Sequence, residues 1–241
     1  MKKSIKIIHR VLIGFFLLIQ LGFFQSCSSL YIPPAINTPL FSEKGEFQAG
    51  ISVGQLYSSD INLSYSFTNN LGVIMNANYC RYRSKLINDY YRFYAGDIGL
   101  GYYRKFNRNM VFEAFGGYGV GHIEGKDLGF NDDIKSPTNK FYFYPTFGHY
   151  SDFFDSAFSL RFISFSYNYS DKYRNDFFVE PIVTTKLGYK NIKFTVQIGY
   201  SFLMNNNPDL YYWPIITTVG GQINLSNKKY NEDKNKPGFF K

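Results

Sequence analysis

The sequence predicts an all-β fold, an antiparallel up-and-down transmembrane β-barrel of about ten strands, with eight as the alternative. The clearest observation is the run from Ile192 to Phe202, in which every second residue is large and apolar while the residues between are polar or glycine. In an extended strand these two sets lie on opposite faces, one suited to lipid and the other to water. Two further observations support the prediction. The chain has 26 Phe and 22 Tyr, and it begins with an export signal.

Residues 1–26 have the features of a bacterial export signal. Four basic residues precede an apolar run from Val11 to Phe24, which ends at Gln25-Ser26-Cys27. The run is too short, and too soon followed by polar residues, for a transmembrane helix. The stretch ending at Cys27 resembles a lipoprotein signal, with Phe24 at the place where leucine is usual. The resemblance implies that Cys27 is acylated, for example by palmitate, and becomes the first mature residue; ordinary cleavage nearby and a retained anchor are the alternatives.

Net charge and cysteine content add little to the functional prediction. Removal of residues 1–26 takes away four of the 26 basic residues and none of the 18 acidic ones, so the mature chain carries a net charge of about +4. This balance gives no reason to expect a nucleic-acid partner. If Cys27 is acylated, Cys80 is the remaining cysteine and no intramolecular disulfide can form. We expect Cys80 to be a small side chain within a strand.

The chain after Cys27 divides into a tether, a barrel and a tail. Residues 27–45 are expected to form a tether, because Pro33, Pro34 and Pro39 discourage both a helix and a central strand. The barrel is expected over residues 46–226, and its predicted strands are 46–54, 58–67, 71–82, 91–106, 110–122, 140–147, 157–168, 177–189, 191–203 and 214–225. The pattern is weakest in 140–147. In 157–168 the alternation changes parity near Ile163 or Ser164, which predicts a β-bulge.

The breaks between these strands predict the orientation of the barrel. Residues 68–70, 107–109 and 190–191 are tight turns, whereas 83–90, 123–139, 169–176 and 204–213 are longer polar loops. Outer-membrane barrels have short periplasmic turns and longer extracellular loops. Both termini are therefore expected in the periplasm, with a lipid on Cys27 in the inner leaflet; the breaks 55–57 and 148–156 fit this alternation poorly. Tyr211, Tyr212 and Trp213 are expected at the outer membrane-water boundary.

The end of the barrel adds a resemblance to known proteins. The stretch TVGGQINL, from Thr218 to Leu225, resembles the signal read by the outer-membrane insertion machinery, and residues 227–241 follow it as a charged periplasmic tail. Together with CSSLYIPPAINTPLFSEKGEFQAGISVG, DIGLGYYRKF and EAFGGYGVG, it makes the chain similar to Bacteroidota-type outer-membrane β-barrel lipoproteins, a family with no settled activity. The resemblance implies three partners: lipoprotein-processing enzymes, the barrel insertion machinery and the outer-membrane bilayer.

Seven charged residues are expected on the inward face of the barrel from parity alone. They are Asp60, Asp97, Glu113, Arg161, Glu180, Lys186 and Lys193. The interior of a barrel of about eight to ten strands is narrow and largely filled by side chains. We therefore expect these charges to form ion pairs that satisfy one another. A conduction or substrate pathway along the same charges is the alternative.

No pattern in the sequence indicates an enzyme, a metal site or a cofactor. His122 and His149 are expected at opposite rims, and neither stands in a recognised catalytic motif. The acidic residues of the 123–139 loop lack the spacing of an EF-hand. The glycines between Gly116 and Gly121 resemble a phosphate-binding loop, but no helix pattern follows them, and alternating glycine in a barrel strand makes room for bulky neighbours.

Three functions are compatible with these observations. The first is a non-enzymatic outer-membrane β-barrel lipoprotein with a structural or loop-mediated binding role. The second is a narrow channel or carrier for a small solute. The third is a lipid-anchored soluble periplasmic barrel that binds an apolar ligand, which requires the opposite parity, with polar residues outside. The export signal, the aromatic content and the final strand favour the first.

Overall fold

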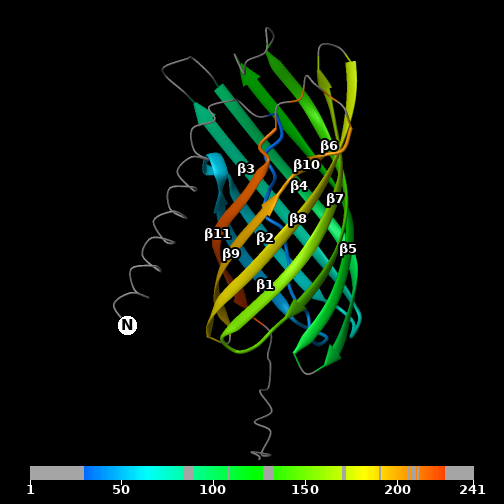
Figure 1. Ribbon diagram of the computed structural model, residues 1–241, viewed down its shortest axis with the longest axis vertical. Coiled ribbons are helices and arrows are strands. Elements are labelled where there is room, and N and C mark those ends of the chain that lie inside the picture. Colours follow the sequence, from blue (N-terminus) through cyan, green and yellow to red (C-terminus); the bar gives the residue numbers. More distant parts are fainter. Residues whose placement is uncertain are drawn as a thin grey trace, which may run out of the picture.

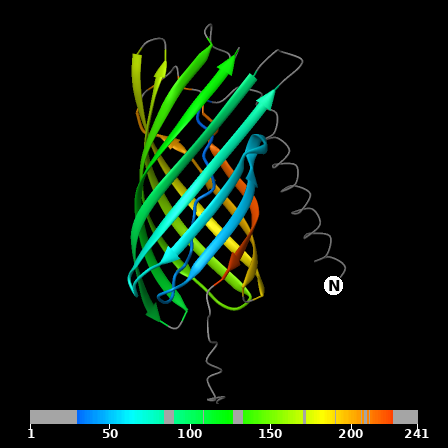
Figure 2. The same cartoon turned by 180° about the vertical axis from the view of Figure 1, so that it is seen from behind.

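The computed structural model of the 241-residue chain describes residues 30–83, 90–107, 109–126, 133–169, 172–189, 191–205, 207, 210 and 212–225. The predicted signal, Cys27 and the tail 227–241 lie outside these residues. The described residues form a closed antiparallel β-barrel, drawn in Figure 1 and from behind in Figure 2. In this part of the chain no helix is long and apolar enough to span a membrane.

The described chain contains eleven strands. They are β1 (Phe47–Gly54), β2 (Ser59–Ser66), β3 (Leu71–Arg83), β4 (Tyr90–Asn107), β5 (Met110–Lys126), β6 (Ile134–His149), β7 (Phe154–Tyr169), β8 (Lys172–Tyr189), β9 (Ile192–Tyr200), β10 (Phe202–Leu203) and β11 (Ile215–Asn224); a short 3-10 turn, η2 (Gln55–Tyr57), follows β1. Strands β1 to β9 pair in sequence order, and β11 closes the ring by pairing with β9 and β1. The short β10 continues β9 and pairs with β8. Because β9 and β10 together occupy one position in the wall, the barrel has ten such positions, hereafter called staves, as predicted.

The connections between strands lie at two ends of the barrel. At one end, hereafter the turn end, strands are joined by residues 67–70, 108–109, 150–153 and 190–191; at the other, the loop end, they are joined by 55–58, 84–89, 127–133, 170–171 and 204–214. The predicted loops 123–139 and 169–176 are shorter than expected, because β5, β6 and β8 continue through their polar residues. Tyr169 still pairs with Lys172. Polar residues show where the apolar outer surface ends, but the backbone pairing between the strands continues through them.

The predicted alternation sets the inner and outer faces of each strand, with one exception in β7. In β8, Glu180 and Lys186 are buried inside, as expected. The bulge predicted in β7 is wrong, because its pairing with β6 and β8 shows no register shift. Phe165 and Tyr167 consequently lie inside the barrel instead of facing outward. Phe165 contacts the ring of Tyr31 there, with centroids 5.2 Å apart.

An apolar band surrounds the outside of the barrel. On each of the ten staves at least one large apolar side chain is between 48% and 68% exposed, for example Ile51, Ile61, Met75, Ile98, Val120, Phe141, Phe158, Val183, Ile198 and Val219. Exposed apolar surface that continues around a whole molecule is far larger than the patches found on soluble monomers. The outer face is therefore built for an apolar environment.

The chain itself occupies the inside of the barrel. Residues 30–41, hereafter the lumen segment, are all buried. Figures 1 and 2 both show this blue stretch running inside the strands along the length of the barrel. The sequence predicted a tether here, because the prolines argue against a strand. Within the lumen, however, proline is well suited to a buried extended segment, since it has no backbone N–H that needs a partner.

The lumen segment joins β1 through a tight reversal at the turn end. The carboxylate of Glu46, which is fully buried, accepts hydrogen bonds from the backbone N–H of Ser42 at 2.9 Å and of Glu43 at 3.0 Å. Gly45 has a φ of +84°, a left-handed conformation that favours glycine. The chain can therefore leave the lumen and enter the barrel wall within a few residues.

Candidate functional site

The candidate site is the contact between the lumen segment and the inner wall of the barrel. An extended segment that lies alone in a barrel has no neighbouring strand to satisfy its backbone groups. In this protein, side chains of the wall take the place of that strand. The side-chain amide of Gln197, on β9, accepts from the Ile36 N–H at 3.0 Å and donates to the Ile36 carbonyl oxygen at 2.7 Å. This two-point contact fixes the middle of the segment.

Near the turn end, two wall charges bind backbone groups of the lumen segment. Glu113 of β5 is fully buried, and its carboxylate accepts from the N–H groups of Leu40 at 3.1 Å and Phe41 at 2.6 Å. Lys186 of β8 donates from Nζ to the carbonyl oxygen of Thr38 at 2.5 Å. Charge-assisted hydrogen bonds of this kind are stronger than neutral ones. The two charges therefore hold the segment instead of lining an open path.

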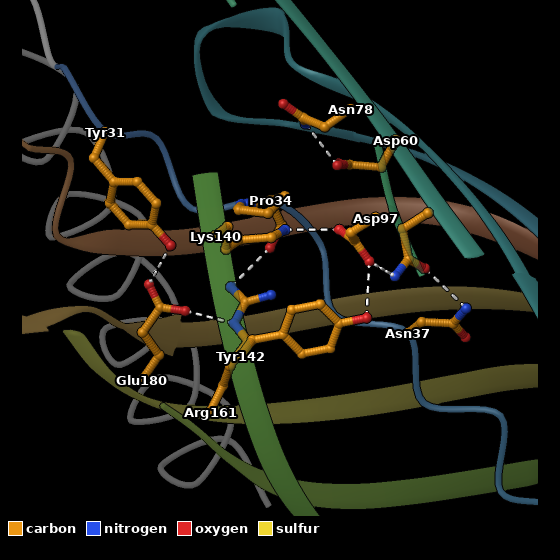
Figure 3. A network of polar contacts seen from close by, with 11 residues as sticks. Tyr31, Pro34, Asn37, Asp60, Asn78, Asp97, Lys140, Tyr142, Arg161 and Glu180 are labelled. Carbon is orange, nitrogen blue, oxygen red and sulfur yellow. Dashed lines mark hydrogen bonds and ion pairs between the residues drawn. The ribbon is translucent and has the colours of Figure 1, made fainter. Parts of the chain in front are cut away.

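Closer to the loop end, an ion pair bridges the wall and the lumen segment (Figure 3). Arg161 of β7 donates from Nε to Glu180 at 2.6 Å and from Nη2 to the Pro34 carbonyl oxygen at 2.9 Å. The second carboxylate oxygen of Glu180 accepts from the hydroxyl groups of Tyr31 at 3.0 Å and Ser201 at 2.8 Å. Both carboxylate oxygens of Glu180 and two nitrogens of the Arg161 guanidinium thus have partners, which offsets the cost of burying the pair.

A second network surrounds Asp97 of β4. Lys140 of β6 donates to one carboxylate oxygen of Asp97 at 2.7 Å, and the hydroxyl of Tyr142 donates to the other at 2.9 Å. Asn76 donates to the same carboxylate at 2.6 Å and accepts from the side chain of Asn37 in the lumen segment at 3.0 Å. Figure 3 shows how these contacts meet the Arg161 pair around the segment.

The two remaining predicted charges lie at different heights in the wall. Asp60 of β2 is buried and accepts from Asn78 at 2.7 Å. Lys193 of β9 pairs with Asp155 of β7 at 2.5 Å, near the turn end. Asp155 and Lys140 were absent from the predicted set. Asp155 had been placed in a break and Lys140 at the edge of the weakest predicted strand, so only their parity within longer strands would have placed them inside.

The seven predicted charges therefore all point into the barrel but do not simply pair with one another. Arg161 and Glu180 form the one ion pair within the set among the described residues. Asp97 and Lys193 pair with residues outside the set, while Asp60 binds an amide. Glu113 and Lys186 bind the backbone of the lumen segment. The sequence missed the segment because a run with three prolines carries no strand pattern.

Glycines in the wall make room for these contacts. A Cβ at Gly117 would lie 2.4 Å from the hydroxyl oxygen of Tyr142, and a Cβ at Gly72 would lie 2.6 Å from Cε2 of Phe41. Cβ atoms do not approach other atoms so closely, so a larger residue at either place must displace its neighbour. The sequence had indicated this role for the glycines between Gly116 and Gly121, but not for those beside the lumen segment.

The spaces left between the lumen segment and the wall are small. Two cavities with many polar residues in their lining have volumes of about 30 and 20 Å³, and another of about 20 Å³, beside Tyr31 and Ile32, is lined mainly by apolar residues. Buried polar atoms without a protein partner lie on residues that line the first two, including Ser52, Asn62 and Thr195 in the first and Asp60 in the second. The first cavity has room for about two water molecules and the second for about one. Neither can hold a solute of appreciable size.

The histidines and the cysteine considered in the sequence analysis make none of the lumen contacts described above. His122 pairs across the sheet with Pro137 toward the loop end, and His149 with Met110 at the turn end, so the two histidines lie at opposite rims. Cys80 is buried with a free thiol. Among the described residues no group of three or more His, Cys, Asp or Glu side chains could hold a metal ion.

Two of the aromatic residues at the loop end, Tyr212 and Trp213, contact the start of the lumen segment. Tyr212 forms a parallel bridge with Tyr31 and packs edge-on against Phe178, with ring centroids 5.4 Å apart. The backbone N–H of Trp213 donates to the carbonyl oxygen of Tyr31 at 2.9 Å. Tyr212 and the backbone of Trp213 therefore contact the lumen segment where it reaches the loop end, and their place at a membrane-water boundary stays a prediction. Tyr211 lies outside the described residues.

Comparison with models of known protein families and with curated proteins finds no match. The functional argument therefore rests on the fold and on the lumen contacts.

Proposed function

We propose that this protein is a non-enzymatic outer-membrane β-barrel lipoprotein, closed by its own lumen segment, with a structural or loop-mediated binding role. The apolar band on all ten staves carries the proposal, because a lipid environment accounts for it. The inner face, in contrast, is rich in paired polar groups. Lipoprotein-processing enzymes and the barrel insertion machinery are the partners that such a protein needs during its assembly.

Membrane fractionation of the Cys27→Ala variant, beside the unaltered chain, tests the proposal. An integral barrel stays with the outer membrane after washing with carbonate or high salt, since its apolar outer face, and not an acyl group on Cys27, holds it there. Its band on a gel shifts upon boiling, because the closed barrel resists detergent at low temperature. Release of the variant into the soluble fraction, with no band shift, would contradict the proposal.

A narrow channel or carrier is the second candidate, favoured by one observation. The wall around the lumen segment carries charged groups whose partners are segment backbone atoms, so a barrel without the segment has a polar passage. With the segment in place, the passage is filled. The full chain in a planar bilayer is therefore expected to be silent, whereas a variant lacking residues 30–42 conducts ions. Conductance of the full chain would favour the channel function.

The third candidate, a soluble barrel with an apolar ligand inside, fits the parity poorly. It requires a polar exterior, whereas large apolar side chains face outward on every stave. It also requires an empty interior, and the lumen segment occupies that space.

A further inference from the structure

The lumen segment runs along the barrel, so that the two ends of the described chain lie at opposite ends of it. Leu30 lies at the loop end, where its carbonyl oxygen accepts from the hydroxyl of Tyr91 at 3.5 Å. Phe41 lies at the turn end. Leu225, the last described residue, is at the turn end as well, since its N–H donates to the carbonyl oxygen of Phe47 at 2.8 Å. The expectation that both ends lie on the turn side therefore fails for Leu30.

The segment crosses the whole apolar band. Its twelve residues span up to about 40 Å when extended. The apolar band of an outer-membrane barrel is about 25 Å tall. Contacts along the segment agree with a complete crossing, because Tyr31 bonds to residues of the loop end and Leu40 to Glu113 near the turn end.

The residues before Leu30 have a short reach. Cys27 is three residues from Leu30, so the chain between them covers at most about 11 Å. The wall is paired all around, which leaves no lateral opening between staves. A return of Cys27 to the turn end would require the segment to leave the lumen. That movement would break the contacts with Gln197, Glu113 and Arg161 together.

We infer that the chain before Leu30 leaves the barrel at the loop end, and that an acyl group on Cys27 is anchored in the membrane leaflet on that side. With the loops facing outward, this is the outer leaflet, and not the inner leaflet that the sequence suggested. The inference rests on the proposed function for the membrane and the acyl group. The side on which the chain leaves depends on the lumen segment alone.

The test uses three forms of the full chain, each with one short epitope. The first carries it between Ser28 and Ser29, the second between Ile87 and Asn88 at the loop end, and the third after Asn231, beyond the turn end. Intact cells and permeabilised cells are probed with an antibody that cannot cross the outer membrane. The band shift on boiling verifies that each form has folded. The first form is also made with Cys27→Ala, which should leave the result unchanged.

The inference predicts that the first epitope is detected under the same conditions as the second and opposite to the third. An epitope before Leu30 that behaves like the one after Asn231, while the loop epitope differs, would overturn the inference and leave the spanning barrel intact. Equal detection of all three in intact cells would instead overturn the proposed function, and the inference with it.

Discussion

The ring of Phe41 covers Gly72, so that a Cβ at this glycine would lie 2.6 Å from Cε2 of the ring. Gly72 belongs to the barrel wall, on β3, whereas Phe41 belongs to the lumen segment. The absence of a side chain at Gly72 thus leaves the space that the ring of Phe41 occupies. Leu40 has a similar relation to Gly148, and this second contact shows that the fit extends to the neighbouring residue of the segment.

The close approach at Gly72 predicts that Gly72→Val destabilises the barrel. Overpacking of this kind costs about 1–3 kcal/mol, because Phe41 must move away from its place in the wall. Urea unfolding in lipid vesicles measures the loss. Gly221→Ala is the matched control, since a Cβ there meets nothing within 4 Å. Equal stability of the two variants would show that Phe41 does not occupy this position.

The contact between Gln197 and Ile36 predicts a loss upon Gln197→Leu. The substitution leaves a buried N–H and a buried carbonyl oxygen of the segment without a partner, and each costs about 1–3 kcal/mol. Thr195→Val on the same strand is the control, because the Thr195 hydroxyl has no protein partner among the described residues. Unfolding midpoints compare the two. A midpoint for Gln197→Leu as high as that of the control would argue against the segment contact.

The pair formed by Arg161 and Glu180 predicts coupled effects. Glu180→Gln leaves the buried guanidinium without its counter-charge, which costs about 3–5 kcal/mol. The double variant Arg161→Met with Glu180→Gln should lose less than the sum of the two single changes, because the charge and its partner then disappear together. A double-mutant cycle on urea unfolding measures this coupling. Additive losses would mean that the two side chains act independently.

The apolar band predicts a cost for charge that depends on depth in the membrane. Ile98 lies midway along β4, and Phe106 lies on the same strand at the turn end. In lipid vesicles Ile98→Lys should cost about 2–4 kcal/mol, whereas a lysine near the interface costs about 0–1 kcal/mol. Phe106→Lys therefore serves as the matched control. A similar small effect at both positions would indicate that the outer face is not in contact with lipid.

The sequence by itself located the strands, favoured ten of them over eight, and determined the faces of most of them. The alternation in β9 places Lys193 and Gln197 inside and Phe194 and Ile198 outside, and each of these positions follows from local geometry. The same periodicity placed all seven predicted charges in the lumen. Tight turns of two or three residues, which fix where strands end, are likewise local in sequence. Polar loops were less informative, because strands continue through them.

Only the tertiary structure decided what fills the barrel and which groups meet there. Ile36 and Gln197 are separated by 161 residues, and no local pattern relates them. The run with Pro33, Pro34 and Pro39 is compatible with a tether as much as with a buried segment, since proline sets a backbone angle and not a location. Phe165 faces inward because β7 pairs with both of its neighbours without a bulge, and inside the barrel it meets the ring of Tyr31. Closure of the barrel creates an interior of defined shape, and that shape determines which side chains and backbone groups meet there.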